Sequence, residues 1–121
     1  MRDHRKLEVF TLADELALRV YEVTRSFPED ERYGLTSQLR RAAVSIGANI
    51  VEGAARQSQS DFLRLLTIAY GSACELEYEI SLANRLGFIT QPHRTKLHNL
   101  ASRTCRALRS LIQAIRLPLP I

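Results

Sequence analysis

The sequence predicts an all-α protein, folded as an up-down-up-down antiparallel four-helix bundle. Four segments of the 121 residues repeat apolar side chains every three or four positions, which is the spacing of one helix face. Glycine and proline are few, at five and four residues, and this favours long regular elements. Only a few residues join the segments, and such short connections make consecutive helices antiparallel neighbours.

The first two helices are expected over about residues 7–26 and 36–55. Pro28 ends the first, because a proline disfavours helical geometry at the residue before it. Thr36 is a plausible N-cap for the second, since its hydroxyl would accept a hydrogen bond from the first turn. The apolar positions of the first helix are Val9, Ala13, Leu16, Val20 and Val23.

The third and fourth helices are expected over about residues 60–86 and 91–115. Ser60 would open the third, and Gly87 is well placed to end it, because glycine adopts the left-handed conformation that commonly follows a helix. The last residues, 117–121 with the sequence LPLPI, are expected to form an extended tail.

Composition places the whole chain, 1–121, in one globular domain. With 45% hydrophobic and 25% charged residues, a disordered chain is excluded. No run approaches the roughly 18 apolar residues of a membrane span, and no apolar region of a secretory signal follows the charged N-terminus. Cys74 and Cys105 lie inside helical patterns, so we expect reduced core thiols in a cytoplasmic protein; whether they pair stays open.

The segment SIGANIVEGAAR, residues 45–56, places polar residues and glycines in apolar helical sequence. At about 100° per residue, the second helix carries a core line, a polar line and a second apolar line nearly opposite the core. A helix with two apolar faces usually packs on a partner through each, which predicts a homo-oligomer; the alternative is that the small residues are simply exposed. The polar line is Gln38, Arg41, Ser45, Asn49 and Glu52, and the second apolar line is Val44, Ala48, Val51 and Ala55.

Two interpretations of the polar line remain. In the structural one, its side chains hydrogen-bond between helices and fix their register, with Arg41 or Arg56 neutralising Glu52. In the catalytic one, Glu52 is a general acid/base and Asn49 orients a substrate. The sequence offers neither a nucleophile with an adjacent base nor the Glu-x-x-His pairs of a di-iron bundle, so we expect no enzyme, no metal and no cofactor.

Mid-helix glycines indicate where helices approach closely. Each costs roughly 1 kcal/mol relative to alanine in a helix. Gly47 and Gly53 lie in the second helix, and the third carries a matching segment with Gly71, Ser72 and Glu75. We therefore expect the second and third helices to pack closely at the glycines, with Glu75 facing the polar line.

Residues 27–77 also carry a family pattern, FP-x-x-E-x-YGL-x-x-Q-x-RRAA-x-SI-x-x-NI-x-EG and then A-x-GS-x-x-E. This pattern resembles that of the 23S rRNA intervening sequence proteins, also labelled S23 ribosomal proteins. Gly47 and Val51 depart from the residues usual there, which should not alter the fold. The matching positions are Phe27, Pro28, Glu31, Tyr33, Gly34, Leu35, Gln38, Arg40, Arg41, Ser45, Ile46, Asn49, Ile50, Glu52, Gly53, Ala69, Gly71, Ser72 and Glu75.

The resemblance implies a four-helix bundle that assembles as a ring-like homo-pentamer. Some members are encoded within insertions in bacterial 23S rRNA genes. A related branch serves as the accessory protein of diversity-generating retroelements, where a basic barrel binds nucleic acid and a reverse transcriptase. The family has no established catalytic residues, so the resemblance implies none here.

Charge is distributed unevenly along the chain. Residues 1–89 hold eleven Lys/Arg against thirteen Asp/Glu, whereas residues 90–121 hold six Lys/Arg and no acid. The fourth helix is therefore expected to bind RNA or DNA phosphates, with weak sequence specificity and strong salt dependence. No aromatic residue lies among these cations to stack bases. The basic positions are Arg94, Lys96, Arg103, Arg106, Arg109 and Arg116.

A second functional hypothesis is a protein-interaction scaffold. Such an oligomer would dock a protein partner, for example a reverse transcriptase, through its outer face or its apolar tail at 117–121. It would do so without binding nucleic acid directly. No membrane partner is expected.

Overall fold

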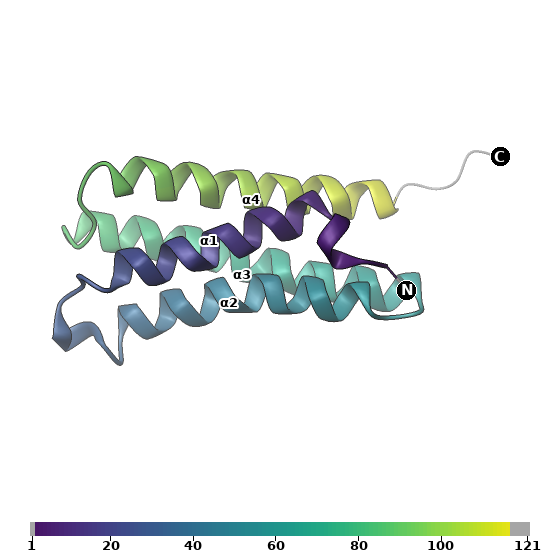
Figure 1. The fold of residues 1–121 in the computed structure, drawn as a ribbon, viewed down its shortest axis with the longest axis horizontal. Helices are drawn as coiled ribbons and strands as arrows, with labels where there is room; N and C mark the ends of the chain where they lie inside the picture. The colour runs from purple at the N-terminus through teal and green to yellow at the C-terminus, as the bar shows by residue number, and fades with distance from the viewer. Residues whose placement is uncertain (1, 117–121) are drawn as a thin grey trace.

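The structure is a computed structural model that describes residues 2–116, and the predicted tail at 117–121 lies outside the described residues. Four long helices lie side by side along one axis (Figure 1). No strand occurs among the described residues, which confirms the all-α class. The helices are α1 (Glu8–Thr24), α2 (Leu35–Ala54), α3 (Gln59–Arg85) and α4 (His93–Arg116), with short 3-10 helices η1 (His4–Lys6) before α1 and η2 (Glu29–Glu31) before α2.

The helices alternate in direction. The α1–α2 and α3–α4 connections lie at one end of the bundle, and the α2–α3 connection lies at the other (Figure 1). Each helix packs on its neighbours in chain order, and α1 packs on α4 to close the bundle. The predicted up-down-up-down four-helix bundle is confirmed. Consequently α3 has two long edges, one along α2 and one along α4.

The core is aliphatic and contains the apolar lines expected from the sequence. All five positions predicted for the first helix are buried, from Val9 to Val23. The core of α4 includes Thr104, whose Oγ1 donates to the Leu100 carbonyl at 2.8 Å, so this buried hydroxyl is satisfied within its own helix. Burial of these lines supplies the main driving force for folding.

The N-termini of α2 and α3 differ from the predicted caps. The Leu35 amide donates to Glu31 Oε1 at 3.0 Å, so a carboxylate from the preceding turn satisfies the start of α2. Thr36 lies buried inside the first turn, and its prediction as a cap is wrong. Ser58 caps α3 by accepting from the Asp61 amide at 3.0 Å, and Ser60, the predicted cap, is already helical.

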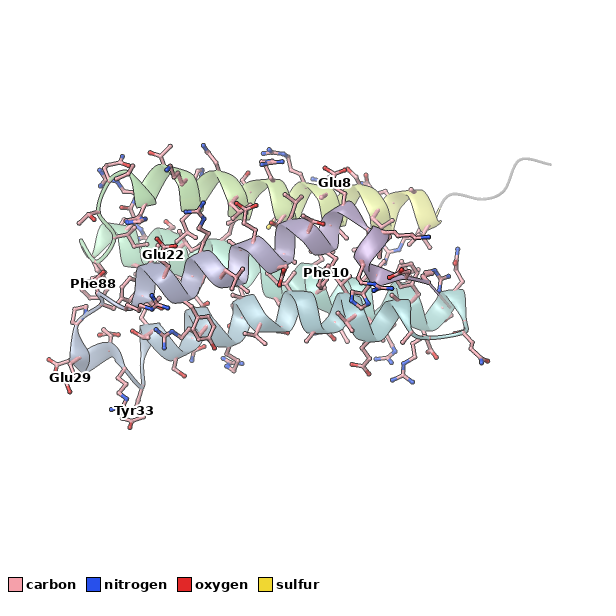
Figure 2. All side chains as sticks on the ribbon, viewed as in Figure 1. Glu8, Phe10, Glu22, Glu29, Tyr33 and Phe88 are labelled. Atoms are coloured by element: carbon pink, nitrogen blue, oxygen red, sulfur yellow. The ribbon has the colours of Figure 1, made fainter. Side chains whose placement is uncertain are left out.

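The end of α3 follows the prediction. Gly87 has a φ of +80°, the left-handed region that glycine adopts without strain. The Phe88 amide returns to the Ala83 carbonyl at 3.0 Å, which is the hydrogen bond of a Schellman motif. Phe88 then packs on Phe27 at a ring separation of 5.5 Å and closes this end of the bundle (Figure 2). The last helix begins at His93, slightly later than predicted.

Candidate functional site

The polar line of α2 meets α3 at two side-chain contacts. Ser45 Oγ lies 2.9 Å from Ser72 Oγ, a hydrogen bond between the helices. Arg41 Nη2 lies 3.8 Å from Glu75 Oε1. Glu75 therefore faces the polar line.

Three other members of the polar line bond within α2, and the prediction of bonds between helices is wrong for them. Arg41 Nη2 donates to Gln38 Oε1 at 2.5 Å. Asn49 Nδ2 donates to the Ser45 carbonyl at 2.8 Å, and Arg56 Nη2 donates to Glu52 Oε1 at 2.7 Å. Gln38 and Glu52 are exposed, and each bonds to an arginine about one turn away along the chain.

Close helix approach occurs at one glycine. A Cβ added at Gly53, which is buried, would lie 3.2 Å from both Leu65 Cβ and Phe62 Cδ1 of α3. At Gly47 and Gly71 an added Cβ would meet nothing within 4 Å, so the prediction of close approach is wrong at these two positions. Gly71 is exposed and Gly47 is half-buried.

Glu79, which the sequence did not single out, lies beside Glu75 on α3. Its side chain is only 7% exposed, and Oε1 has no hydrogen-bond partner. Burial, and secondarily the negative charge of Glu75, raises the pKa of Glu79 to about 7, while Arg41 opposes the shift. We call Arg41, Ser45, Gly53, Ser72, Glu75 and Glu79 the α2–α3 seam.

The second apolar line of α2 is exposed to solvent. Val44 and Val51 are 48% and 36% exposed, and Ala48 and Ala55 between and beyond them are exposed too. These residues are partly covered by their neighbours in the bundle and keep a substantial solvent-facing area. The line forms an exposed apolar row along the outer face of α2.

All six basic positions of α4 are exposed. Among residues 2–116, none of their side chains lies within 4.0 Å of a carboxylate. Arg94 Nη1 donates to Asn84 Oδ1 at 3.4 Å and Arg106 Nη1 donates to Ser102 Oγ at 2.8 Å, and both acceptors are neutral. These cations therefore keep their charge available to an external anion.

The six cations do not form one cluster. Lys96 and Arg103 lie along α1, where they line a shallow hollow with Glu15 and Arg19. The others are distributed across the solvent face of α4 and its α3 edge. The α1 side is therefore a mixed-charge surface, and the α3 side is the more uniformly basic one.

The α3 edge of α4 carries two hollows. The larger, of about 760 Å³, is lined by Tyr78, Asn84, Arg94 and His98 among others. The smaller, of about 210 Å³, is lined by Thr67, Tyr70, Arg109, Gln113 and Arg116. We call the edge containing both hollows the α3–α4 groove.

These tyrosines correct the expectation that no aromatic residue accompanies the cations. They belong to α3, so the sequence of α4 alone does not reveal them. Tyr78 is 62% exposed and Tyr70 is half-buried. The neighbouring Cys74 thiol raises the pKa of the Tyr70 phenol, which keeps it neutral. Tyr70, Cys74 and Tyr78 recur every four residues along one edge of α3, and this spacing is the signal that places them together.

The cysteines differ from each other. Cys105 is buried and its Sγ donates to Glu77 Oε1 at 3.3 Å, whereas Cys74 is exposed, so the expectation of two core thiols is wrong for Cys74. Burial raises the pKa of Cys105 to about 12, which keeps the thiol protonated. Both cysteines are free in this structure.

In the part of the chain described, no three His, Cys, Asp or Glu side chains gather as a metal site would require. None of the described helices combines the length and the apolar character needed to cross a membrane.

Comparison with known proteins places the chain in a family. Residues 5–110 match the model of the 23S rRNA-intervening sequence proteins. A crystal structure from Bacteroides thetaiotaomicron, of a protein with unknown function from the S23 ribosomal protein family, is similar at 31% identity and a TM-score of 0.77. The match covers 87% of this chain and 98% of that one, and no curated protein matches. Neither description names an enzymatic activity. The chain belongs to the 23S rRNA-intervening sequence protein family.

Proposed function

We propose that this protein is a non-enzymatic oligomer that binds the phosphates of RNA or DNA through α4. The observation that carries the proposal is the set of six exposed cations on α4 without a carboxylate partner among residues 2–116.

The comparison with other cations strengthens the argument. Arg41 and Arg56 lie 3.8 Å and 2.7 Å from the carboxylates of Glu75 and Glu52. An external phosphate would have to compete with those carboxylates. On α4, no carboxylate among residues 2–116 lies within 4.0 Å to compete with the phosphate. Each phosphate that pairs with a cation of α4 releases a counterion from the nucleic acid. Binding should therefore be salt-sensitive and largely independent of base sequence.

The absence of catalysis is part of the proposal. Glu79 is the carboxylate whose pKa is raised to about 7, which is a range suited to acid–base chemistry. It is buried, and the charged groups that act on it are Glu75 of α3 and Arg41 of α2. Its environment is better explained as part of the α2–α3 seam than as a reaction centre.

Oligomerisation is supported by the exposed row on α2. Val44, Ala48, Val51 and Ala55 present an apolar strip that the bundle itself leaves exposed. A second copy would remove this strip from water, and burial of apolar surface drives most protein association. In a closed ring the basic surface of each copy would repeat, which enlarges the field that attracts nucleic acid.

A protein-interaction scaffold is the second candidate. Tyr33 favours it, because this residue of the α1–α2 connection is 87% exposed and projects from the end of the bundle (Figure 2). Exposed tyrosines are enriched at protein interfaces. In this alternative the basic helix would contribute to solubility and not to binding.

The test of nucleic-acid binding is a salt series. Affinities for a single-stranded RNA, a single-stranded DNA and a duplex are measured by fluorescence anisotropy for the wild type and for Arg103→Glu/Arg106→Glu. We expect binding at low salt that weakens at least tenfold in the variant. The matched control is Arg25→Glu/Arg64→Glu, which makes the same charge change at two exposed positions, one directly after α1 and one on α3. Equal weakening in both variants, or no binding by the wild type, would refute the proposal.

The test of assembly is light scattering. The wild type should scatter as a multiple of the 13.7 kDa chain, and Val44→Glu/Val51→Glu should scatter as the single chain. Ser110→Glu/Ala114→Glu places the same two charges on exposed positions of α4 and should leave the assembly intact. A wild-type protein of 13.7 kDa in dilute solution would contradict the oligomer.

A further inference from the structure

We propose that the α3–α4 groove binds single-stranded nucleic acid, with Tyr70 and Tyr78 stacking on unpaired bases while the cations of α4 hold the phosphates. The inference rests on the proposed function and deepens it. It names the ligand as a strand with unpaired bases, and it places the bases on α3 and the backbone on α4.

The groove consists of two rows of side chains that face each other. Helices α3 and α4 are antiparallel neighbours, and their facing edges bring residues distant in sequence into shared hollows. Tyr78 shares the larger hollow with Arg94 and His98. Tyr70 shares the smaller hollow with Arg109 and Arg116. Each tyrosine therefore has at least one cation of α4 across the groove from it.

The spacing of the tyrosines suits an extended strand. Eight residues of helix separate Tyr70 from Tyr78, or about 12 Å at 1.5 Å per residue. Eight residues turn the helix by about 80° beyond two full turns, so the two rings are offset around α3, but each still borders a hollow that it shares with cations of α4. Two aromatic platforms with cations alongside form the arrangement by which proteins bind single strands without reading sequence.

The charge of the groove is predominantly positive. The acids of α3 are Asp61, Glu75, Glu77 and Glu79. Glu75 and Glu79 lie together near Arg41 of α2, and Asp61 lies in the first turn. Glu77 does line the larger hollow, but it is half-buried and accepts the hydrogen bond of Cys105. The exposed charges along the groove are thus mainly those of Arg94, Arg109 and Arg116.

The larger hollow also offers neutral hydrogen-bonding groups. Ser81, Asn84, Gln91 and Thr95 line it together with Tyr78. Amide and hydroxyl side chains both donate and accept, so they can pair with the edges of an unpaired base. A duplex would satisfy only the phosphate contacts, because its base faces are already stacked inside the double helix. The groove should therefore prefer a single strand.

The test compares ligands that differ in their bases, in their sugar or in their strandedness. The ligands are a 20-nucleotide oligothymidine, the corresponding oligouridine, an abasic strand of the same length and a DNA duplex. The proteins are the wild type, Tyr70→Leu, Tyr78→Leu, Tyr78→Phe and, as matched control, Tyr33→Leu. Affinity is measured by anisotropy. Because the chain has no tryptophan, quenching of tyrosine fluorescence reports stacking directly.

We expect each Tyr→Leu change in the groove to weaken binding of both base-bearing strands by roughly 5-fold or more, as for stacked bases elsewhere. Binding of the abasic strand and of the duplex should change less than 2-fold. Tyr78→Phe keeps the ring and should bind like the wild type, as should Tyr33→Leu. The ratio of oligothymidine to oligouridine affinity tells whether DNA or RNA is preferred.

Two results would overturn the inference. One is unchanged oligothymidine binding in Tyr78→Leu, which alters an exposed side chain and should fold normally. The other is an equal loss on the abasic strand, which would mean that the ring does not stack on bases. If either result occurred while Arg103→Glu/Arg106→Glu still weakened nucleic-acid binding, the proposal that α4 binds phosphates would stand and only the stacking on tyrosines would be refuted. A failure of all ligands to bind would instead refute the proposed function itself.

Discussion

The two long edges of α3 differ in whether the cations along them have a carboxylate partner. Along α2, one hydrogen bond, Ser45 to Ser72 at 2.9 Å, and one ion pair, Arg41 to Glu75 at 3.8 Å, connect the helices. Along α4, Arg94, Arg109 and Arg116 have no carboxylate within 4.0 Å among residues 2–116. The first edge is occupied by the protein's own groups, and the second leaves its charges to solvent.

The contrast separates structural polar residues from binding ones. A polar group that is satisfied by a neighbouring helix contributes to register and stability, whereas an exposed unpaired cation contributes little to folding. Substitutions in the α2–α3 seam should therefore change the free energy of unfolding and leave ligand affinity alone. Substitutions of charged residues in the α3–α4 groove should do the reverse.

The largest effect is expected at Gly53. Gly53→Leu forces a side chain against Leu65 and Phe62, where even a Cβ would lie at 3.2 Å. Overpacking a core contact with several carbons should lower the free energy of unfolding by about 3 kcal/mol or more. Gly71→Leu is the matched control, since open space surrounds that position, and it should be neutral or slightly stabilising. Urea denaturation measures both, and equal losses would show that the two glycines do not differ.

Glu79 should make stability depend on pH. Its folded pKa of about 7 lies above the value of about 4.3 in an unfolded chain, so between these values the folded state binds more protons. The free energy of unfolding therefore falls as pH rises through this window. Glu79→Gln removes the buried charge and should stabilise the protein by about 1 to 3 kcal/mol at pH 8, and by almost nothing at pH 4.

The control for this prediction is Glu22→Gln, an exposed carboxylate on α1. Denaturation at both pH values should show no comparable dependence for Glu22→Gln. A difference between Glu79→Gln and the wild type that is the same at pH 4 and pH 8 would mean that Glu79 does not titrate in this window.

The smallest effect is expected at the serine pair. Ser72→Ala removes the hydrogen bond to Ser45 and should cost about 1 kcal/mol of stability. Ser45 retains Asn49 Nδ2 as a donor at 3.1 Å, which limits the loss. A double-mutant cycle with Ser45→Ala measures the coupling across the seam. A coupling energy of zero would show that the Ser45–Ser72 hydrogen bond does not help to fix the register of α2 against α3.

The fold was largely predictable because it depends on spacing that the sequence displays directly. Apolar lines such as Val9 to Val23 determine which face of each helix is buried, and Gly87 marks a helix end by its conformational freedom. The caps were less predictable. Glu31 and Ser58 accept the capping hydrogen bonds, whereas the sequence pointed to Thr36 and Ser60 nearby. Which of two neighbouring polar residues caps a helix depends on tertiary geometry, and the local sequence pattern does not contain it.

The candidate site was predictable only in part. The cations of α4 are evident from composition, and the contact of Glu75 with the polar line follows from helix periodicity. The glycines could not be told apart by sequence, because close approach at Gly53 and open space at Gly71 depend on how the helices cross. Tyr70 and Tyr78 were missed because they join the cations of α4 only once two antiparallel helices are paired.

The most direct test of the difference between the two edges is the salt dependence of single-strand binding. Arg109→Gln/Arg116→Gln removes two cations from the groove. Arg41→Gln/Arg56→Gln removes one cation from α2 and one just after its end, with the same change in net charge. For oligothymidine, the slope of log K against log salt should become shallower by about 0.7 for each lost phosphate contact in the groove variant. It should stay at the wild-type value in the α2 variant. Equal slopes in both variants would contradict the assignment of the α3–α4 groove as the binding face.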